Sequence, residues 1–386
     1  MKIIKQISVL LMVAGLISSC IERYYPESTT GFISRLVIEG TIIPDEGEQE
    51  IIISNSSSPE KPDFLPVSGC IVKIEDEKGN SFLFQESKNA GHYRGTIDGN
   101  FVIIGANYRL FVQTPNGNKY ISKYEKLLPC PAVDSVYYEL QTKEKTVGDV
   151  EDGLQFFVDF KGDDTYGKFY RWQLVETYEY HSSAPLQKWL DVDGNHSLAG
   201  PDFSNFVCYK TDYLNEIFVL STEGFTQNSY KKYKLHFVND RTQRLLHKYS
   251  LLVKQYSLSA GAYDYWRSLK KNNQETVDMF GKQPANVKGN IYNLNDTTER
   301  VLGYFIVSSV RSKRIMVHSI DGLTFKKLPV CKAMPIQGPL PSDRPLYFAD
   351  AIDESGQTVK GIISEQCIFC ALLGGTTKKP NFWDKK

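Results

Sequence analysis

The seven cysteines are the residues of this sequence with the widest choice of chemistry. Two of them form the motif Cys367-Ile368-Phe369-Cys370, a spacing used for thiol–disulfide exchange, for zinc ligation or for cross-linking. A redox pair needs a helix start inside an α/β domain, and the surrounding sequence predicts neither. A zinc site needs two further ligands, which Cys208 and Cys331 could supply. We therefore favour structural cross-linking, with zinc as the alternative.

An even number of cysteines follows residue 20, as is typical of disulfides in an exported protein. Six thiols can pair in many ways, so the sequence does not determine the connectivity. Disulfides near the C-terminus would fasten a loop-rich tail that has little core of its own. The disulfide candidates are Cys70, Cys130, Cys208, Cys331, Cys367 and Cys370.

Cys20 follows a segment with the charge layout of a secretory signal. Two lysines near the start precede an apolar run from Ile7 to Ile17, which is too short to span a bilayer. Ile17-Ser18-Ser19-Cys20 resembles a bacterial lipobox, whose small residues give a signal peptidase access to the chain. We predict a signal peptide over residues 1–19, acylation of Cys20 and a tether over residues 20–34. More than one acyl chain would make the anchoring stable.

A short acidic segment is the best candidate for a metal site. Calcium binds loops that present several closely spaced oxygen ligands, and the candidate ligands here are Asp191, Asp193, Asn195 and Asp202. His196 occupies the position where a calcium loop needs glycine, and no predicted helices flank the segment. Aspartate, glycine and asparagine also form ordinary turns. We favour an exposed loop and no cofactor, with calcium as the alternative.

No catalytic motif is visible in the sequence. It contains no G-x-S-x-G elbow and no P-loop. The histidines form no H-E-x-x-H or H-x-x-x-H arrangement; they are His92, His181, His196, His236, His247 and His318. We predict a protein without enzymatic activity. Because catalytic triads assemble from distant residues, a hydrolase with an unrecognised site is kept as an alternative.

Charge and composition narrow the choice of partners. The 45 basic and 45 acidic residues balance, and loss of Lys2 and Lys5 with the signal peptide would leave a charge near −2. Such a chain has no cationic excess for nucleic acid or for an anionic membrane face. The aromatic content of 12% suits half-buried β-surfaces.

The hydrophobic pattern predicts a mainly β protein with two domains. Residues 35–128 contain seven short strand-like segments with turns between them, which favours an immunoglobulin-like or transthyretin-like β-sandwich. Pro129-Cys130-Pro131 marks the boundary. Residues 131–386 form a larger β-rich domain, and its segment Lys168–Tyr180 has Tyr170, Trp172 and Leu174 on one face.

One helix is expected in the larger domain. Residues Ala260–Asn273 place Ala262, Tyr265, Trp266 and Leu269 at helical spacing. Farther along, Val301–Val310 and Arg314–Ser319 predict a hairpin that turns at Arg311-Ser312-Lys313. The region from Leu328 onward is expected to be a loop-rich tail held by disulfides.

Several segments resemble an uncharacterised lipoprotein family of the Bacteroidota. The resemblance includes Leu36-Val37-Ile38-Glu39-Gly40, the helix motif Ala262-Tyr263-x-Tyr265-Trp266, and a C-terminal signature of Cys367-x-x-Cys370, Gly374-Gly375-Thr376, Pro380 and Phe382-Trp383. The family has a domain-of-unknown-function label, and its genes commonly lie beside those of TonB-dependent transporters. The resemblance implies an outer-membrane lipoprotein that is an accessory to a transporter. It implies no catalytic residues.

We therefore expect a protein anchored to the outer membrane by lipid, on either its periplasmic or its surface face. Its expected partners are that membrane and a TonB-dependent barrel, for which it would capture or present a ligand. The alternative is a free-standing surface adhesin or glycan-binding module. Aromatic-rich strands and the proline-rich segment Ser56–Pro66 suggest this alternative.

Overall fold

The computed structural model describes residues 32–384, apart from 45–46, 59–61, 147, 192–193, 276–286, 324, 326–330, 337 and 341–344. The expected signal peptide, Cys20 and most of the expected tether lie outside the described residues, and so does Asp193. Strands dominate the described part of the chain, which confirms the prediction of a mainly β protein. The strands belong to four sheets.

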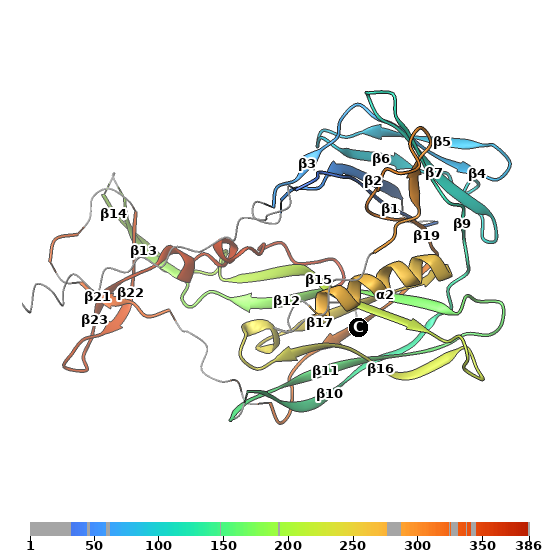
Figure 1. The fold of residues 1–386 in the computed structure, drawn as a ribbon. Helices are drawn as coiled ribbons and strands as arrows, with labels where there is room; N and C mark the ends of the chain where they lie inside the picture. Colours follow the sequence, from blue (N-terminus) through green and yellow to red (C-terminus); the bar gives the residue numbers. More distant parts are fainter. Residues whose placement is uncertain are drawn as a thin grey trace, which may run out of the picture.

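The N-terminal unit is an eleven-stranded sheet that curls around one apolar core (Figure 1). Its main path runs β18-β8-β7-β4-β5-β6-β2-β1-β19, with β3 paired to β2 and β9 paired to β7. The strands are β1 (Leu36–Ile42), β2 (Glu48–Asn55), β3 (Leu65–Pro66), β4 (Ile71–Asp76), β5 (Ser81–Glu86), β6 (His92–Thr96), β7 (Asn107–Gln113), β8 (Lys119–Ser122), β9 (Glu125–Lys126), β18 (Ile291–Asn293) and β19 (Phe305–Val307).

Two strands of this unit come from far along the chain. Strand β18 pairs with β8, and β19 runs parallel to β1 with Phe305 opposite Gly40. Phe305 and Val307 are buried in the N-terminal core. Gly303 makes the close approach possible, because it has a φ of 91° and a Cβ there would collide with the Ile38 carbonyl. The core of residues 35–128 is therefore completed by a returning segment.

This return overturns the predicted hairpin over residues 301–319. Phe305–Val307 leaves the central part of the molecule and joins the N-terminal sheet. The next strand, β20 (Val310–Val317), runs straight through the expected turn at residues 311–313 and pairs with β17. The apolar residues of β19 are buried in the core of the N-terminal unit, which removes more apolar surface from water than a local hairpin would.

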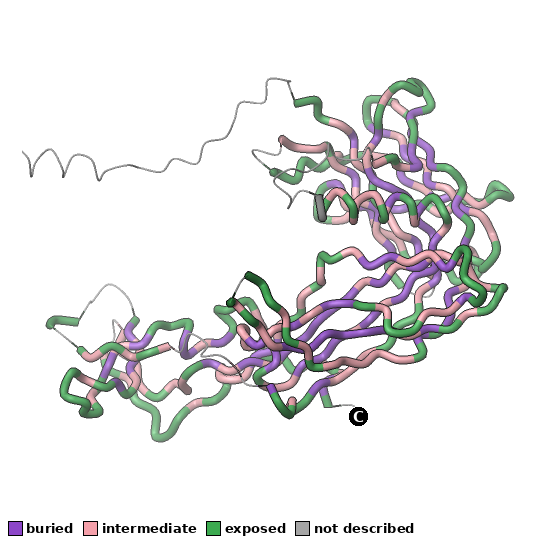
Figure 2. Tube along the Cα trace, turned by 60° about the horizontal axis from the view of Figure 1, so that its bottom comes forward, coloured by how far each residue is buried: buried purple, intermediate pink, exposed green. Residues whose placement is uncertain are grey.

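Two sheets face each other in the centre of the molecule, and their shared core contains Phe156, Phe160, Trp172 and Leu251. Figure 2 shows the buried residues concentrated along these long strands. One sheet has the order β10-β11-β16 and the other β15-β12-β17-β20. The strands are β10 (Val133–Thr146), β11 (Asp149–Lys161), β16 (Ser229–Asn239), β15 (Val207–Ser221), β12 (Phe169–His181) and β17 (Tyr249–Leu258), and a short 3-10 turn η1 (Gln243–Leu245) precedes β17.

Helix α2 (Ala260–Glu275) confirms the predicted helix and extends it by two residues. The hydroxyl of Ser259 accepts a hydrogen bond from the backbone N–H of Ala262 and so caps its first turn. Ala262 and Tyr265 pack in a small cluster with Ile306 of the N-terminal unit and Tyr256 of β17. The helix therefore lies between the two units (Figure 1). Among the described residues, no helix has the length and apolar character needed to cross a bilayer.

The tail, expected to be loop-rich, contributes three strands to a fourth sheet with the order β14-β13-β22-β23-β21. Two disulfides hold it: Cys208–Cys370 joins it to β15, and Cys331–Cys367 closes a loop inside it. They confirm the disulfide-stapled tail. The elements are β13 (Leu186–Asp191), β14 (Gly194–Asp202), β21 (Met334–Pro335), β22 (Leu346–Ile352), β23 (Thr358–Ile363) and the short turns η2 (Glu365–Cys367) and η3 (Cys370–Leu373).

Candidate ligand-binding pocket

Two of the six disulfide candidates, Cys70 and Cys130, are free thiols, which corrects the prediction for them. They belong to different parts of the fold, and each thiol donates to a nearby carbonyl, that of Val67 for Cys70 and that of Gln255 for Cys130. Burial raises the pKa of Cys130 to about 12, so this thiol is protonated at neutral pH and is a poor nucleophile. The other four cysteines form the two disulfides.

The predicted calcium ligands are not brought together. Asp191 and Gly194 face each other at the turn of the β13–β14 hairpin, and the strand then carries Asp202 to the opposite end, beside Leu186. The carboxylate of Asp191 is bonded to His196, and that of Asp202 accepts from Ser204. Asn195 lies in strand β14, and Asp193 lies outside the described residues. The segment forms a hairpin because the pairing of β13 with β14 satisfies its backbone polar groups without an ion.

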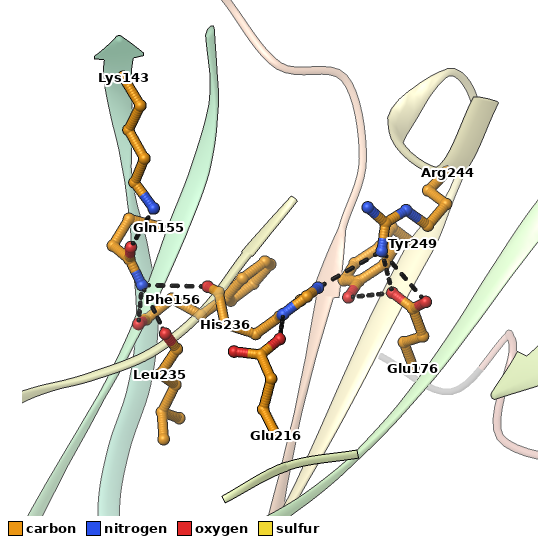
Figure 3. A network of polar contacts seen from close by, with 9 residues as sticks. All are labelled: Lys143, Gln155, Phe156, Glu176, Glu216, Leu235, His236, Arg244 and Tyr249. Carbon is orange, nitrogen blue, oxygen red and sulfur yellow. Dashed lines mark hydrogen bonds and ion pairs between the residues drawn. The ribbon is translucent and has the colours of Figure 1, made fainter. Parts of the chain in front are cut away.

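A polar network in the central sandwich is the most enzyme-like arrangement of side chains there (Figure 3). The ring of His236 bonds Glu216 through Nδ1, and its Nε2 lies 3.4 Å from Nη1 of Arg244. Arg244 in turn donates to both carboxylate oxygens of Glu176, at 3.3 Å each. Both nitrogens of His236 are thus engaged by charged side chains, and neither activates a hydroxyl or thiol nucleophile. The network is a satisfied structural cluster.

A more promising site is a pocket of about 390 Å³ between the two units. Strand β1 forms one wall, helix α2 a second, and the face of β12 and β17 opposite the central core forms the floor. Its polar residues are Glu39, Arg171 and Gln173, and its aromatic residues are Tyr256, Tyr265, Trp266 and Tyr304. A concave site with aromatic walls and few polar groups is typical of small-molecule binding.

Arg171 is the residue that gives this pocket its charge. It alternates with Tyr170 and Trp172, which point into the central core, so its own side chain points toward α2. Its guanidinium carbon lies 3.8 Å from the centre of the Trp266 ring and 5.5 Å from that of Tyr256. Its Nε is buried without a hydrogen-bond acceptor. Burial lowers the pKa of Arg171, and no carboxylate lies close enough to form an ion pair with it in the described structure.

Two further polar groups of the pocket also have no partner among the described residues. The indole Nε1 of Trp266 is buried and unbonded. The carboxylate of Glu39, on the face of β1 opposite the buried Ile38, reaches solvent but lies in a concave surrounding that raises its pKa by desolvation. A cation, an N–H donor and a carboxylate thus line one cavity without bonding each other. Burying such polar groups costs free energy unless a ligand supplies the missing hydrogen bonds.

A second pocket, of about 680 Å³, lies on the other side of Tyr265 and Tyr304. Glu125 is buried at its wall, where Oε1 accepts from Tyr304 at 2.7 Å and from Asn290 at 3.1 Å, while no hydrogen bond to Oε2 is found among the described residues. Burial raises the pKa of Glu125 above its ordinary value, despite the opposing effect of these donors. The region around α2 therefore contains unpaired polar groups in two adjacent cavities.

Sequence reasoning missed Arg171, Glu39, Trp266 and Glu125 as site residues. A partial signal existed, since β12 alternates an apolar face with one that includes Arg171, and α2 was expected to have Trp266 on its apolar side. Nothing local indicated that these two faces meet. Their meeting depends on the return of residues 301–307 to the N-terminal sheet.

The fold and the pocket define a multi-sheet β protein with a ligand-sized cavity where its two units join. A family model described as "Domain of unknown function (DUF4249)" matches residues 21–314, and the chain belongs to this family. The expectation of a domain-of-unknown-function family is thereby confirmed. The cysteine-containing C-terminal signature lies beyond the matched residues, and the lipoprotein and Bacteroidota assignments stay predictions.

Other known proteins add little to this. No curated protein matches the chain. A crystal structure of trypsin-activated alpha-2-macroglobulin from Escherichia coli is similar with 12% identity and a TM-score of 0.20, over 62% of this chain but only 15% of that one. The B domain of a biofilm-associated protein has 8% identity and a TM-score of 0.14, over 75% of this chain and 86% of that one. Such low TM-scores support no conclusion about function.

Proposed function

We propose that this protein is a non-enzymatic, lipid-anchored outer-membrane protein that binds a small acidic ligand in the Arg171 pocket and is an accessory to a TonB-dependent transporter. The observation behind this proposal is the guanidinium of Arg171, which lies against aromatic rings and whose buried Nε has no acceptor among the described residues. Carboxylate and phosphate groups are the ligands that a guanidinium binds best. Tyr256 and Trp266 offer flat surfaces for the rest of the ligand.

The absence of enzymatic activity is supported by the chemistry of the described residues. The free thiols are protonated or engaged, and His236 is held between Glu216 and Arg244. The pocket contains a cation and hydrogen-bonding groups but no nucleophile paired with a base. These features suit reversible binding better than bond cleavage.

The sequence supports the membrane part of the proposal. The lipobox-like segment ending at Cys20 predicts acylation, and the family resemblance links the chain to transporter genes. The proposed ligand would then pass between this protein and the barrel, and the pocket between the two units is where we place it before transfer.

The test is a crosslinked pulldown of the native protein from its own outer membrane, with identification of the partners by mass spectrometry. The matched control is Cys20→Ser, which removes the acylated thiol and leaves the described residues unchanged. We expect a TonB-dependent barrel as the main partner of the wild-type protein and its loss in the control. Recovery of the lipidated protein without any barrel would contradict the transporter role and favour the free-standing adhesin or glycan-binding module.

A further inference from the structure

A second group of side chains gathers at the opposite end of β12 from Arg171. Glu179 and His181 lie at the end of this strand, and His247 lies in the segment between η1 and β17. The potential ligand atoms of these three residues all lie within 4.8 Å of one another. All three are half-buried, so the group is accessible to a small ion from solvent.

The carboxylate of Glu179 is already oriented for ligation. Its Oε1 lies 3.0 Å from Nε2 of His181, and its Oε2 accepts a hydrogen bond of 3.1 Å from the indole Nε1 of Trp383. Trp383 is itself fully buried against Tyr209. Metal-binding carboxylates are commonly fixed by such an outer hydrogen bond, here from Trp383 to Oε2, and Oε1, which now bonds His181, is the oxygen that would face the ion.

His247 is the third member of the group, and its ring lies against that of His181. The two imidazole rings stack with centroids 3.7 Å apart and planes inclined by 20°. Two cationic rings would repel at this distance. The ring nitrogens of His247 have no hydrogen bond in the described structure, so this ring is the one free to turn.

We propose that Glu179, His181 and His247 bind a divalent transition-metal ion of the zinc class. Two neutral imidazoles and one carboxylate are a frequent three-ligand set for such ions, with a fourth position left for water or another ligand. Calcium, by contrast, prefers six or more oxygen ligands, which this group does not offer.

Binding requires two local changes. An imidazole ligates through a lone pair in its ring plane, and two nearly parallel rings do not share one ion position. His247 must therefore rotate out of the stack. His181 must carry its proton on Nδ1, because Nε2 faces the carboxylate and would become the ligand atom.

The position of the group gives the ion a structural role. Glu179 and His181 belong to the central sheet, His247 to the loop before β17, and Trp383 to the end of the disulfide-held tail. A bound ion would connect the sheet to this loop and fix the orientation of the carboxylate that accepts the hydrogen bond of Trp383. Binding to the folded state alone raises thermal stability in proportion to the ligand concentration.

The test is titration of the full chain with Zn²⁺, in mild detergent, without a polyhistidine tag and after removal of metals by a chelator. Calorimetry and the melting temperature are the two readouts. We expect binding of one Zn²⁺ with a raised melting temperature, and little response to Ca²⁺. His181→Gln and His247→Gln should each weaken Zn²⁺ binding at least tenfold, as should Glu179→Gln, which retains an acceptor for Trp383.

His318→Gln is the matched control, because His318 is exposed and lies outside the group. Its Zn²⁺ affinity should equal that of the wild-type protein. Far-ultraviolet circular dichroism of each variant without metal checks that it is folded. Equal Zn²⁺ affinity in the wild-type protein and in a folded His181→Gln, His247→Gln double variant would overturn the proposal, as would a wild-type protein that takes up no Zn²⁺.

Discussion

Two charged residues of the same strand, Glu176 and Arg171, have opposite surroundings. Glu176 is 3% exposed and accepts hydrogen bonds from Arg244 and Tyr249, inside the network of Figure 3. Arg171 contacts two aromatic rings, and its buried Nε has no acceptor in the part of the chain that the structure describes. Strand β12 thus contains a satisfied charge in the central core and an unsatisfied one beneath α2.

The difference separates stability from function. A buried charge with all its partners holds the fold in one arrangement, and removing one partner leaves the other uncompensated. A buried charge without a partner lowers the free energy of unfolding. We therefore expect such a charge where a ligand supplies the missing partner. We therefore interpret the Glu176 network as a structural element and the Arg171 pocket as the proposed ligand site.

The largest change in stability is expected on removal of Glu176, the charge whose hydrogen-bond partners are all present. Glu176→Ala leaves Arg244 without its carboxylate and the fully buried Tyr249 hydroxyl without its acceptor. We expect the free energy of unfolding to fall by about 3 kcal/mol, measured by urea denaturation. Glu223→Ala, at an exposed position, is the control and should change it by less than about 0.5 kcal/mol. Similar losses in both variants would show that the network contributes nothing specific.

A smaller effect of opposite sign is expected beside the pocket, at Glu125. Burial raises its pKa above the ordinary value of 4.5, so its contribution to stability is present below pH 4.5 and is lost as rising pH ionises it in the folded state. Glu125→Gln retains acceptors for Tyr304 and Asn290 but cannot ionise. Relative to wild type, the variant should gain on the order of 1 kcal/mol between pH 4 and pH 8. Urea denaturation at several pH values measures this, and a constant difference would contradict it.

Much of the fold could be predicted from local pattern. The helix at Ala260, the face of Tyr170, Trp172 and Leu174, and the mainly β class follow from periodicity, which reports burial directly. The β18 and β19 pairings could not be predicted, because three-residue strands have too little pattern and their partners lie far away in sequence. The disulfide prediction was wrong for Cys70 and Cys130 for the same reason, because an even number of cysteines says nothing about the distances between them.

The sequence contained only a partial signal for the candidate site. Arg171 on a strand face has the pattern of an ordinary solvent-exposed residue, and only the packing of α2 over that face makes it a half-buried cation. Likewise His181 and His247 are separated by the whole of β13 to β16, and the stack between them exists only in the folded chain. Site prediction here required knowledge of which surfaces meet.

Replacing Arg171 should separate its effect on stability from its effect on ligand binding. Arg171→Met preserves side-chain volume and removes a charge without a partner, so stability should change by less than about 1 kcal/mol. Affinity for the tightest binder in a panel of small carboxylates and organic phosphates should fall roughly a hundredfold, measured by calorimetry. Arg300→Met, at an exposed arginine, should leave that affinity unchanged. Unaltered affinity in Arg171→Met would remove the pocket from the proposed function.

The smallest effect should come from the unbonded indole N–H of Trp266. Trp266→Phe keeps an aromatic ring against Arg171 and deletes a donor that bonds nothing in the described structure, so the melting temperature should change little. If the ligand accepts a hydrogen bond from Nε1, its affinity should fall roughly fivefold, because one neutral hydrogen bond contributes about 1 kcal/mol. Combining Trp266→Phe with Arg171→Met tests whether both groups hold the same part of the ligand. A combined loss smaller than the sum would place them on one acidic group, and an additive loss would place them on separate parts of the ligand.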